Sequence, residues 1–112
     1  MESKRQQKIS KLLQKDLGEI FQREAGSLFG GAMITVTKVH VTKDLGIARV
    51  FLSLFATKNK QALLEKVRKE GNQIRWQLGN KVKHQLRKIP ELHFYEDDSL
   101  DYIENIETLL NE

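Results

Sequence analysis

The stretch that most constrains the fold runs from residue 69 to residue 89, where a helical pattern of apolar residues precedes a proline. On an ideal helix with about 100° per residue, aliphatic side chains of this stretch fall within one arc. They are Ile74, Leu78, Val82 and Leu86. A helix with a single apolar face must bury that face, so the chain needs a second layer of secondary structure to cover it.

The opposite arc of the same helix is polar, cationic and aromatic. It carries Trp76, Asn80, Lys83 and Arg87. Two cations, an amide and a flat ring suit a partner that combines negative charge with flat rings, which is the chemistry of nucleic acid. Trp76 could instead pack beneath the C-terminal segment or against the first helix, and would then belong to the core.

A long helix is expected before this stretch. Residues 3–25 repeat apolar positions at helical spacing, Ser3 suits the N-cap, and Gly26 is expected to end the helix. Gly30 and Gly31 then mark a turn. They lie in neither a Gly-Lys-Ser/Thr motif nor a GxGxxG motif, so a plain turn is favoured over a phosphate-binding loop.

Two strands are expected in the middle of the chain. Residues 33–42 and 47–55 are rich in β-branched and apolar residues, and a short turn joins them. The short connection predicts an antiparallel hairpin. The apolar alternation of the first strand changes phase, which predicts a β-bulge near Lys38.

The helical pattern of residues 58–88 divides at Gly71. The first piece is expected to run through Lys69, with its N-cap at Thr57 or Asn59. The second piece is expected to reach about residue 88, because the proline that follows stops a helix and pushes the preceding residue toward extended backbone.

The chain is expected to close with a short strand and an acidic segment. Residues 92–96 predict a third strand, and residues 98–112 keep apolar residues at helical spacing among carboxylates. That segment could be a docked helix, a mobile tail or a cover for the basic face. Residues 1–97 are then one α+β domain of order α-β-β-α(kink)α-β, with helices covering one face of a three-stranded sheet.

Charge is distributed unevenly along a chain whose net charge is +4. Residues 58–90 carry ten basic and two acidic side chains, whereas residues 91–112 carry eight acidic and no basic ones. The basic block attracts polyanions, and the acidic block does not share that contact. A solubilising face is the alternative explanation of the lysines.

Several classes of function are disfavoured. The sequence has no cysteine, which removes disulfides, thiolate catalysis and sulfur-ligated zinc. No apolar run approaches the roughly 20 residues of a membrane span, and the charged N-terminus lacks the apolar core of a secretory signal. We therefore expect a cytoplasmic protein that does not bind membranes.

Catalysis is disfavoured as well. His40, His84 and His93 lack the spacing of a metal site, and no nucleophile lies in a recognisable elbow. The clustered carboxylates of Asp97, Asp98 and Asp101 could bind Mg²⁺ loosely, but helix capping and solvation explain them better. We expect neither an enzyme nor a bound metal or cofactor.

The chain resembles the ribosome-binding factor A family from Lys4 to Leu110. The resemblance rests on the element order and on two segments, ITVTKVHVTKDLGIARVFLSLF and GNQIRWQLGNKVKHQLRKIPELHFYEDDSLD. It implies a KH-like fold of the type II topology and a non-enzymatic protein that binds the small (30S) ribosomal subunit near the decoding region. It further implies a role in late subunit maturation, in 16S rRNA processing and in growth in the cold.

The family's kink carries an Ala-x-Gly pattern in place of the GxxG loop that clamps the backbone in ordinary KH domains. Here the kink is Lys69-Glu70-Gly71, so the glycine matches and a lysine replaces the alanine. That replacement adds a cation where phosphate is expected.

We expect the small subunit and its 16S rRNA to be the partner of a monomer, bound through residues at the kink and on α-helical faces. The candidates near the kink are Arg68, Lys69, Gly71, Asn72, Arg75, Trp76, Asn80, Lys83, Arg87 and Lys88. Arg75 lies at the edge of the apolar arc and could instead be a structural residue bonded to a helix carbonyl or a carboxylate. Arg5 and Lys8 are a second phosphate contact or a solvated face.

Two alternatives remain at this point. One is a KH-like RNA-binding module without ribosome specificity. The other is a protein–protein adaptor that uses the acidic segment together with Phe51 and Phe55. Apolar adaptor contacts would bind nearly independently of ionic strength, whereas phosphate contacts weaken steeply with salt.

Overall fold

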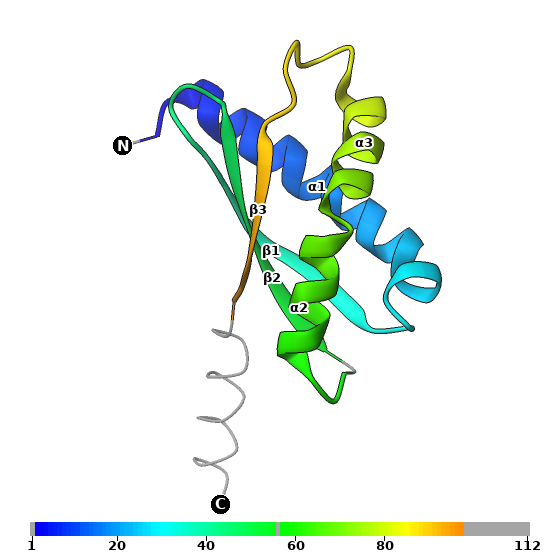
Figure 1. The fold of residues 1–112 in the computed structure, drawn as a ribbon. Helices are drawn as coiled ribbons and strands as arrows, with labels where there is room; N and C mark the ends of the chain where they lie inside the picture. Colours follow the sequence, from blue (N-terminus) through cyan, green and yellow to red (C-terminus); the bar gives the residue numbers. More distant parts are fainter. Residues whose placement is uncertain (1, 56, 98–112) are drawn as a thin grey trace, which may run out of the picture.

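The fold is taken from a computed structural model, which describes residues 2–55 and 57–97 (Figure 1). Its elements are α1 (Lys4–Leu28), β1 (Met33–Val41), β2 (Ile47–Phe55), α2 (Lys60–Lys69), α3 (Gly71–Val82) and β3 (Glu91–Glu96). This order confirms the predicted α-β-β-α-α-β arrangement. The acidic segment 98–112, expected as a helix or a tail, lies outside the described residues.

The three strands form one sheet in the order β1-β2-β3. β1 and β2 pair antiparallel and confirm the hairpin, while β2 and β3 pair parallel. The register between β1 and β2 shifts between Val36 and Lys38, which confirms the predicted bulge. A parallel pair needs a long crossover, and α2, α3 and the loop after them provide it.

One face of the sheet is buried under the helices. Alternate residues of β2, such as Val50 and Leu52, are completely buried, as are Leu17 of α1 and Leu78 of α3. On the opposite face Phe51 of β2 stacks on a neighbour from β3, with ring centroids 5.5 Å apart. The expected helix-covered, three-stranded α+β domain is therefore observed.

α1 begins as predicted and ends later than predicted. The Ser3 hydroxyl accepts from the backbone N–H of Gln6, whose side chain accepts in turn from the N–H of Ser3, a capping box. The expectation that Gly26 ends this helix is wrong, because the helix continues to Leu28. The stop lies at Gly30 and Gly31, whose φ values of 61° and 83° favour glycine.

α2 begins at the second of the two predicted caps. The side chain of Asn59 accepts a hydrogen bond from the N–H of Ala62 at 3.1 Å. Leu63 and Val67 point into the core and are buried. The helix ends at Lys69, as predicted, one residue before the kink.

α3 is shorter than predicted. The expectation that it continues to about Lys88 is wrong, because it ends at Val82. The chain then turns and comes back beside α3, so that Ile89 lies next to Gly79. A continuing helix could not return to start β3 beside β2. Figure 1 shows the loop of residues 83–90 arching past the end of α3 and returning to β3.

Candidate nucleic-acid interface

The kink between α2 and α3 is a bend at one residue. Glu70 is the C-cap of α2 and the N-cap of α3, with φ −88° and ψ 10°. Its N–H donates to the carbonyl of Lys66, and its own carbonyl accepts from the N–H of Ile74, both at 3.0 Å. Helical hydrogen bonding therefore continues on both sides of the bend, which fixes the direction of α3 relative to α2.

Gly71 follows the bend and starts α3. A side chain placed there would meet the Phe94 ring at 3.7 Å, an ordinary contact distance. The space at this position therefore tolerates a small side chain. Gly71 itself is half-buried beside that ring.

The two arginines near the kink bind the backbone of the following strand and loop. Arg68 donates through Nε and Nη2 to the carbonyl of Phe94, at 3.1 and 2.7 Å. Arg75 donates through Nη2 to Ile89 and through Nε to Pro90, at 2.7 and 3.1 Å. Their guanidinium groups thus hold β3 and the loop against the helices, and their positive charge remains near the surface.

The returning loop rebuilds the polar face that was predicted for a longer helix. Arg87 and Lys88 lie in the loop rather than on α3, yet they line the same hollow as Trp76 and Asn80. The hydrogen bonds of Arg75 to the end of this loop hold it in that position. The structure therefore brings these predicted residues together by a fold-back.

Two adjoining hollows result. The Trp76 hollow, of 670 Å³, lies between α3 and the loop and is lined by Asn72, Arg75, Trp76, Gly79, Asn80, Arg87, Lys88 and Ile89. The strand hollow, of 630 Å³, lies between the kink and β3 and includes the predicted residues Arg68, Gly71, Asn72, Arg75 and Lys88, together with one acidic residue, Glu91. Asn72, Arg75 and Lys88 line both hollows, so the two form one continuous surface.

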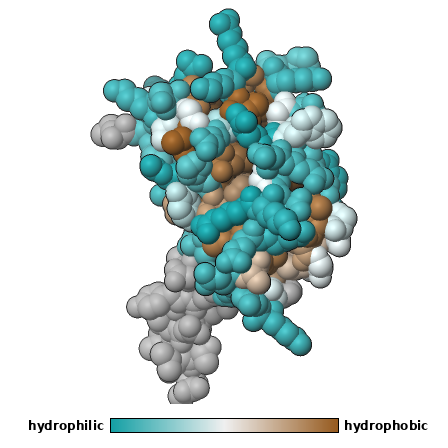
Figure 2. All heavy atoms as spheres, in the orientation of Figure 1, coloured by the Kyte–Doolittle hydropathy of each residue, from teal (hydrophilic) through white to brown (hydrophobic). Residues whose placement is uncertain are grey.

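The remaining predicted residues lie outside both hollows. Lys69 is the exposed last residue of α2, and Lys83 is the exposed C-cap of α3. Arg5 and Lys8 are exposed on the first turns of α1 and line neither hollow. Figure 2 shows that hydrophilic residues dominate the side of the molecule that carries α2 and α3.

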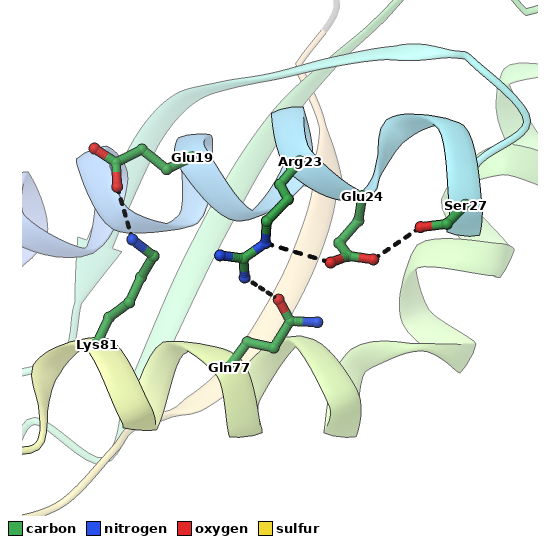
Figure 3. Close-up of polar contacts among 6 residues, drawn as sticks. All are labelled: Glu19, Arg23, Glu24, Ser27, Gln77 and Lys81. Carbon is green, nitrogen blue, oxygen red and sulfur yellow. Dashed lines mark hydrogen bonds and ion pairs between the residues drawn. The ribbon is translucent and has the colours of Figure 1, made fainter.

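Polar contacts tie α3 to α1 behind this surface (Figure 3). Lys81 donates to the carboxylate of Glu19 at 2.7 Å, and Arg23 donates to the side chain of Gln77. The hydrogen bond and the charge of Lys81 lower the pKa of Glu19 below its ordinary value. These contacts use the side of α3 that faces α1, and leave the side with Trp76 open.

A larger hollow, of 820 Å³, lies between α1 and the start of β1. It contains none of the predicted residues and has mainly apolar walls, so its chemistry differs from that of the two hollows beside α3. Within residues 2–55 and 57–97 no cluster of three metal-ligating side chains occurs. No helix in this described part is long and apolar enough to cross a membrane.

Comparison with known proteins identifies the family. The family model for ribosome-binding factor A matches residues 5–110. The chain belongs to the ribosome-binding factor A family. The ribosome-binding factor A of Christiangramia forsetii is 45% identical over 109 residues, which cover 95% of this chain and 82% of that protein. That of Flavobacterium psychrophilum is 46% identical over 111 residues, covering 98% and 85%.

Solved structures of ribosome-binding factor A share the fold. The crystal structure from Thermus thermophilus has a TM-score of 0.69 at 20% identity, covering 81% of this chain and 94% of that one. The solution structure of a Thermotoga maritima protein described as a putative ribosome-binding factor A has a TM-score of 0.68 at 24% identity, covering 87% and 91%. At these identities the likeness concerns the fold.

The contact between Ile89 and Gly79 was not predicted from the sequence. Ile89 packs over the position of Gly79 and closes one side of the Trp76 hollow. Pro90 restrains only the residue before it, so it predicted extended backbone at Ile89 and not the end of α3 at Val82. The helix ends earlier because the chain must fold back to start β3 beside β2.

Proposed function

We propose that this chain binds free small (30S) ribosomal subunits through the helix-kink-helix and acts in late maturation of that subunit, including processing of its 16S rRNA. It acts stoichiometrically, as a cytoplasmic monomer, and supports growth in the cold. Family membership supports the choice of partner. A homology model of the Thermus thermophilus ribosome-binding factor A was fitted into the map of a 30S complex with that protein.

One observation on this chain carries the proposal. The fold-back of residues 83–90 places Arg87 and Lys88 on the same surface as Trp76 and Asn80, next to the kink. Basic side chains bind phosphates, an exposed ring stacks on bases, and amides bond to base edges or sugar groups. No acidic residue lines the Trp76 hollow, so nothing within it opposes a polyanion.

The basic surface also suits a protein that acts by binding and does not catalyse a reaction. Arg68 and Arg75 donate hydrogen bonds to backbone carbonyls of β3 and the loop. These bonds hold the surface in place before a partner binds. A rigid surface binds with a smaller loss of conformational entropy. Such a surface can hold rRNA in an immature arrangement or block early use of the subunit.

Charge reversal at the end of α3 and in the loop that follows it tests the proposal. The double variant Lys83→Glu, Arg87→Glu should fail to co-sediment with isolated small subunits while retaining a native circular dichroism spectrum. The matched control is Lys38→Glu, Arg49→Glu, which makes the same charge change at an exposed lysine and an exposed arginine of the hairpin, outside the basic block. Equal co-sedimentation of the two double variants would refute the assignment of the surface.

A further inference from the structure

Trp76 is exposed without a structural reason in the described part of the chain. Its side chain is 69% exposed, whereas the neighbouring core positions Ile74 and Leu78 on the same helix are completely buried. A single exposed apolar residue is common on protein surfaces. Trp76 differs from such a residue in its surroundings. It lies in a hollow that also contains amide side chains, basic side chains and a glycine.

The helix contributes two amides to that hollow. Asn72 and Asn80 lie four residues before and four residues after Trp76, which places all three side chains along one stripe of α3. An asparagine side chain offers both a donor and an acceptor, and it can pair with the edge of a nucleobase. The indole therefore has, on each side along the helix, an amide that can hydrogen-bond to the edge of a base stacked on it.

The loop contributes the opposite wall. Arg87 and Lys88 supply positive charge there, and Ile89 supplies an apolar contact. Gly79 adds no side chain to the floor between helix and loop, and Ile89 lies there at 3.5 Å from the position that a methyl group would take, an ordinary contact distance. A flat apolar face, paired amides and nearby cations are together the chemistry of one nucleotide.

We propose that the Trp76 hollow binds a single unpaired base of the RNA, stacked on the indole. The inference rests on the proposed function and names the ligand of one part of its surface. The base must be unpaired, because a base within a duplex is stacked on both faces and cannot offer one to a side chain on a helix. The phosphates beside that base contact Arg87 and Lys88.

The sequence provides a direct probe, because Trp76 is the single tryptophan of the chain. The full-length protein is titrated with a short RNA hairpin that carries one bulged adenosine, and with the same hairpin fully paired. The bulged hairpin should quench and shift the tryptophan emission at saturation. The paired hairpin, which has nearly the same number of phosphates, should bind more weakly and leave the emission unchanged.

Affinity measurements on variants complete the test, with fluorescently labelled hairpins and anisotropy as the readout. Trp76→Ala should lose about 5- to 150-fold in affinity for the bulged hairpin and should bind it no better than the paired one. Trp76→Phe, which keeps a ring, should retain part of the preference. Both variants should keep the melting temperature of the parent, as the exposed ring predicts.

Equal quenching by the two hairpins, or equal losses of affinity for both on Trp76→Ala, would overturn the inference. So would a large fall in melting temperature, because Trp76 would then belong to the core. These results are distinct from failure of the proposed function. If Trp76→Ala co-sediments with small subunits as well as the parent does, while Lys83→Glu with Arg87→Glu does not, ribosome binding stands and the base site falls.

Discussion

Nη2 of Arg75, on α3, donates to the carbonyl oxygen of Ile89 at 2.7 Å, and this contact joins a helix to a loop 14 residues further along the chain. Nε of the same guanidinium holds Pro90. The contact fixes the place of Arg87 and Lys88 beside α3. Arg75 was expected to contact RNA or to bond a helix carbonyl or a carboxylate; it bonds carbonyls of the loop instead, and so positions the cations beside it.

Arg75→Gln should destabilise the fold and weaken subunit binding together. Hydrogen bonds to charged groups contribute about 1.5–3 kcal/mol each in general, and the exposed position of this pair places the loss near the low end, about 1–2 kcal/mol. Urea unfolding measures the stability and co-sedimentation measures the binding. Arg87→Gln is the matched control, since it removes the same charge from the loop and should change stability by less than about 0.5 kcal/mol. Equal stability of the two variants would contradict the positioning role.

Two glycines should respond in opposite directions to the same substitution. Gly18 lies inside α1 with open space around an added methyl group, so Gly18→Ala should stabilise the protein by up to about 1 kcal/mol. Gly31 has a φ of 83°, so Gly31→Ala should destabilise it by about 1 kcal/mol or more. Thermal unfolding of both variants checks the prediction, and a change of the same sign in each would refute this account of how α1 ends.

The contact between Glu19 and Lys81 should make stability depend on pH. Because the pKa of Glu19 is lowered in the folded protein, its contribution is present above the unfolded pKa, about 4.3, and is lost as the pH falls through the lowered value. A double-mutant cycle of Glu19→Gln and Lys81→Gln should show coupling at pH 7 that disappears at acidic pH. Coupling that grows on acidification would contradict the assigned sign.

Local patterns predicted the elements well where the relevant physics is local. The phase change around Lys38 identified the bulge, because side chains alternate strictly along a strand. Residues 69–89 were less predictable. Leu86 continues the apolar period of α3, yet the helix ends at Val82, because the chain must fold back to place β3 beside β2. That requirement comes from the pairing of strands far apart in the sequence, and a local helical pattern carries no information about such pairing.

The same distinction applies to the candidate site. Composition and charge identified the basic block, and the helical wheel grouped Trp76 with Asn80. The role of Arg75 depends on where Ile89 lies, and only the folded chain defines that position. Arg87 lies on the predicted surface, but in the loop that folds back beside α3 and not on the helix itself, as the helical wheel had placed it.

The central claim is that a basic surface at the kink binds the RNA of the small subunit, and its most direct test is co-sedimentation with isolated small subunits across a salt series. Each phosphate neutralised contributes about −0.7 to −0.9 to the slope of log K against log salt. Contacts from Lys69, Lys83, Arg87 and Lys88 therefore predict a slope of about −3. Lys83→Ala should make that slope shallower by about 1. A slope near zero, unchanged by Lys83→Ala, would contradict the account and indicate an adaptor that binds through apolar contacts.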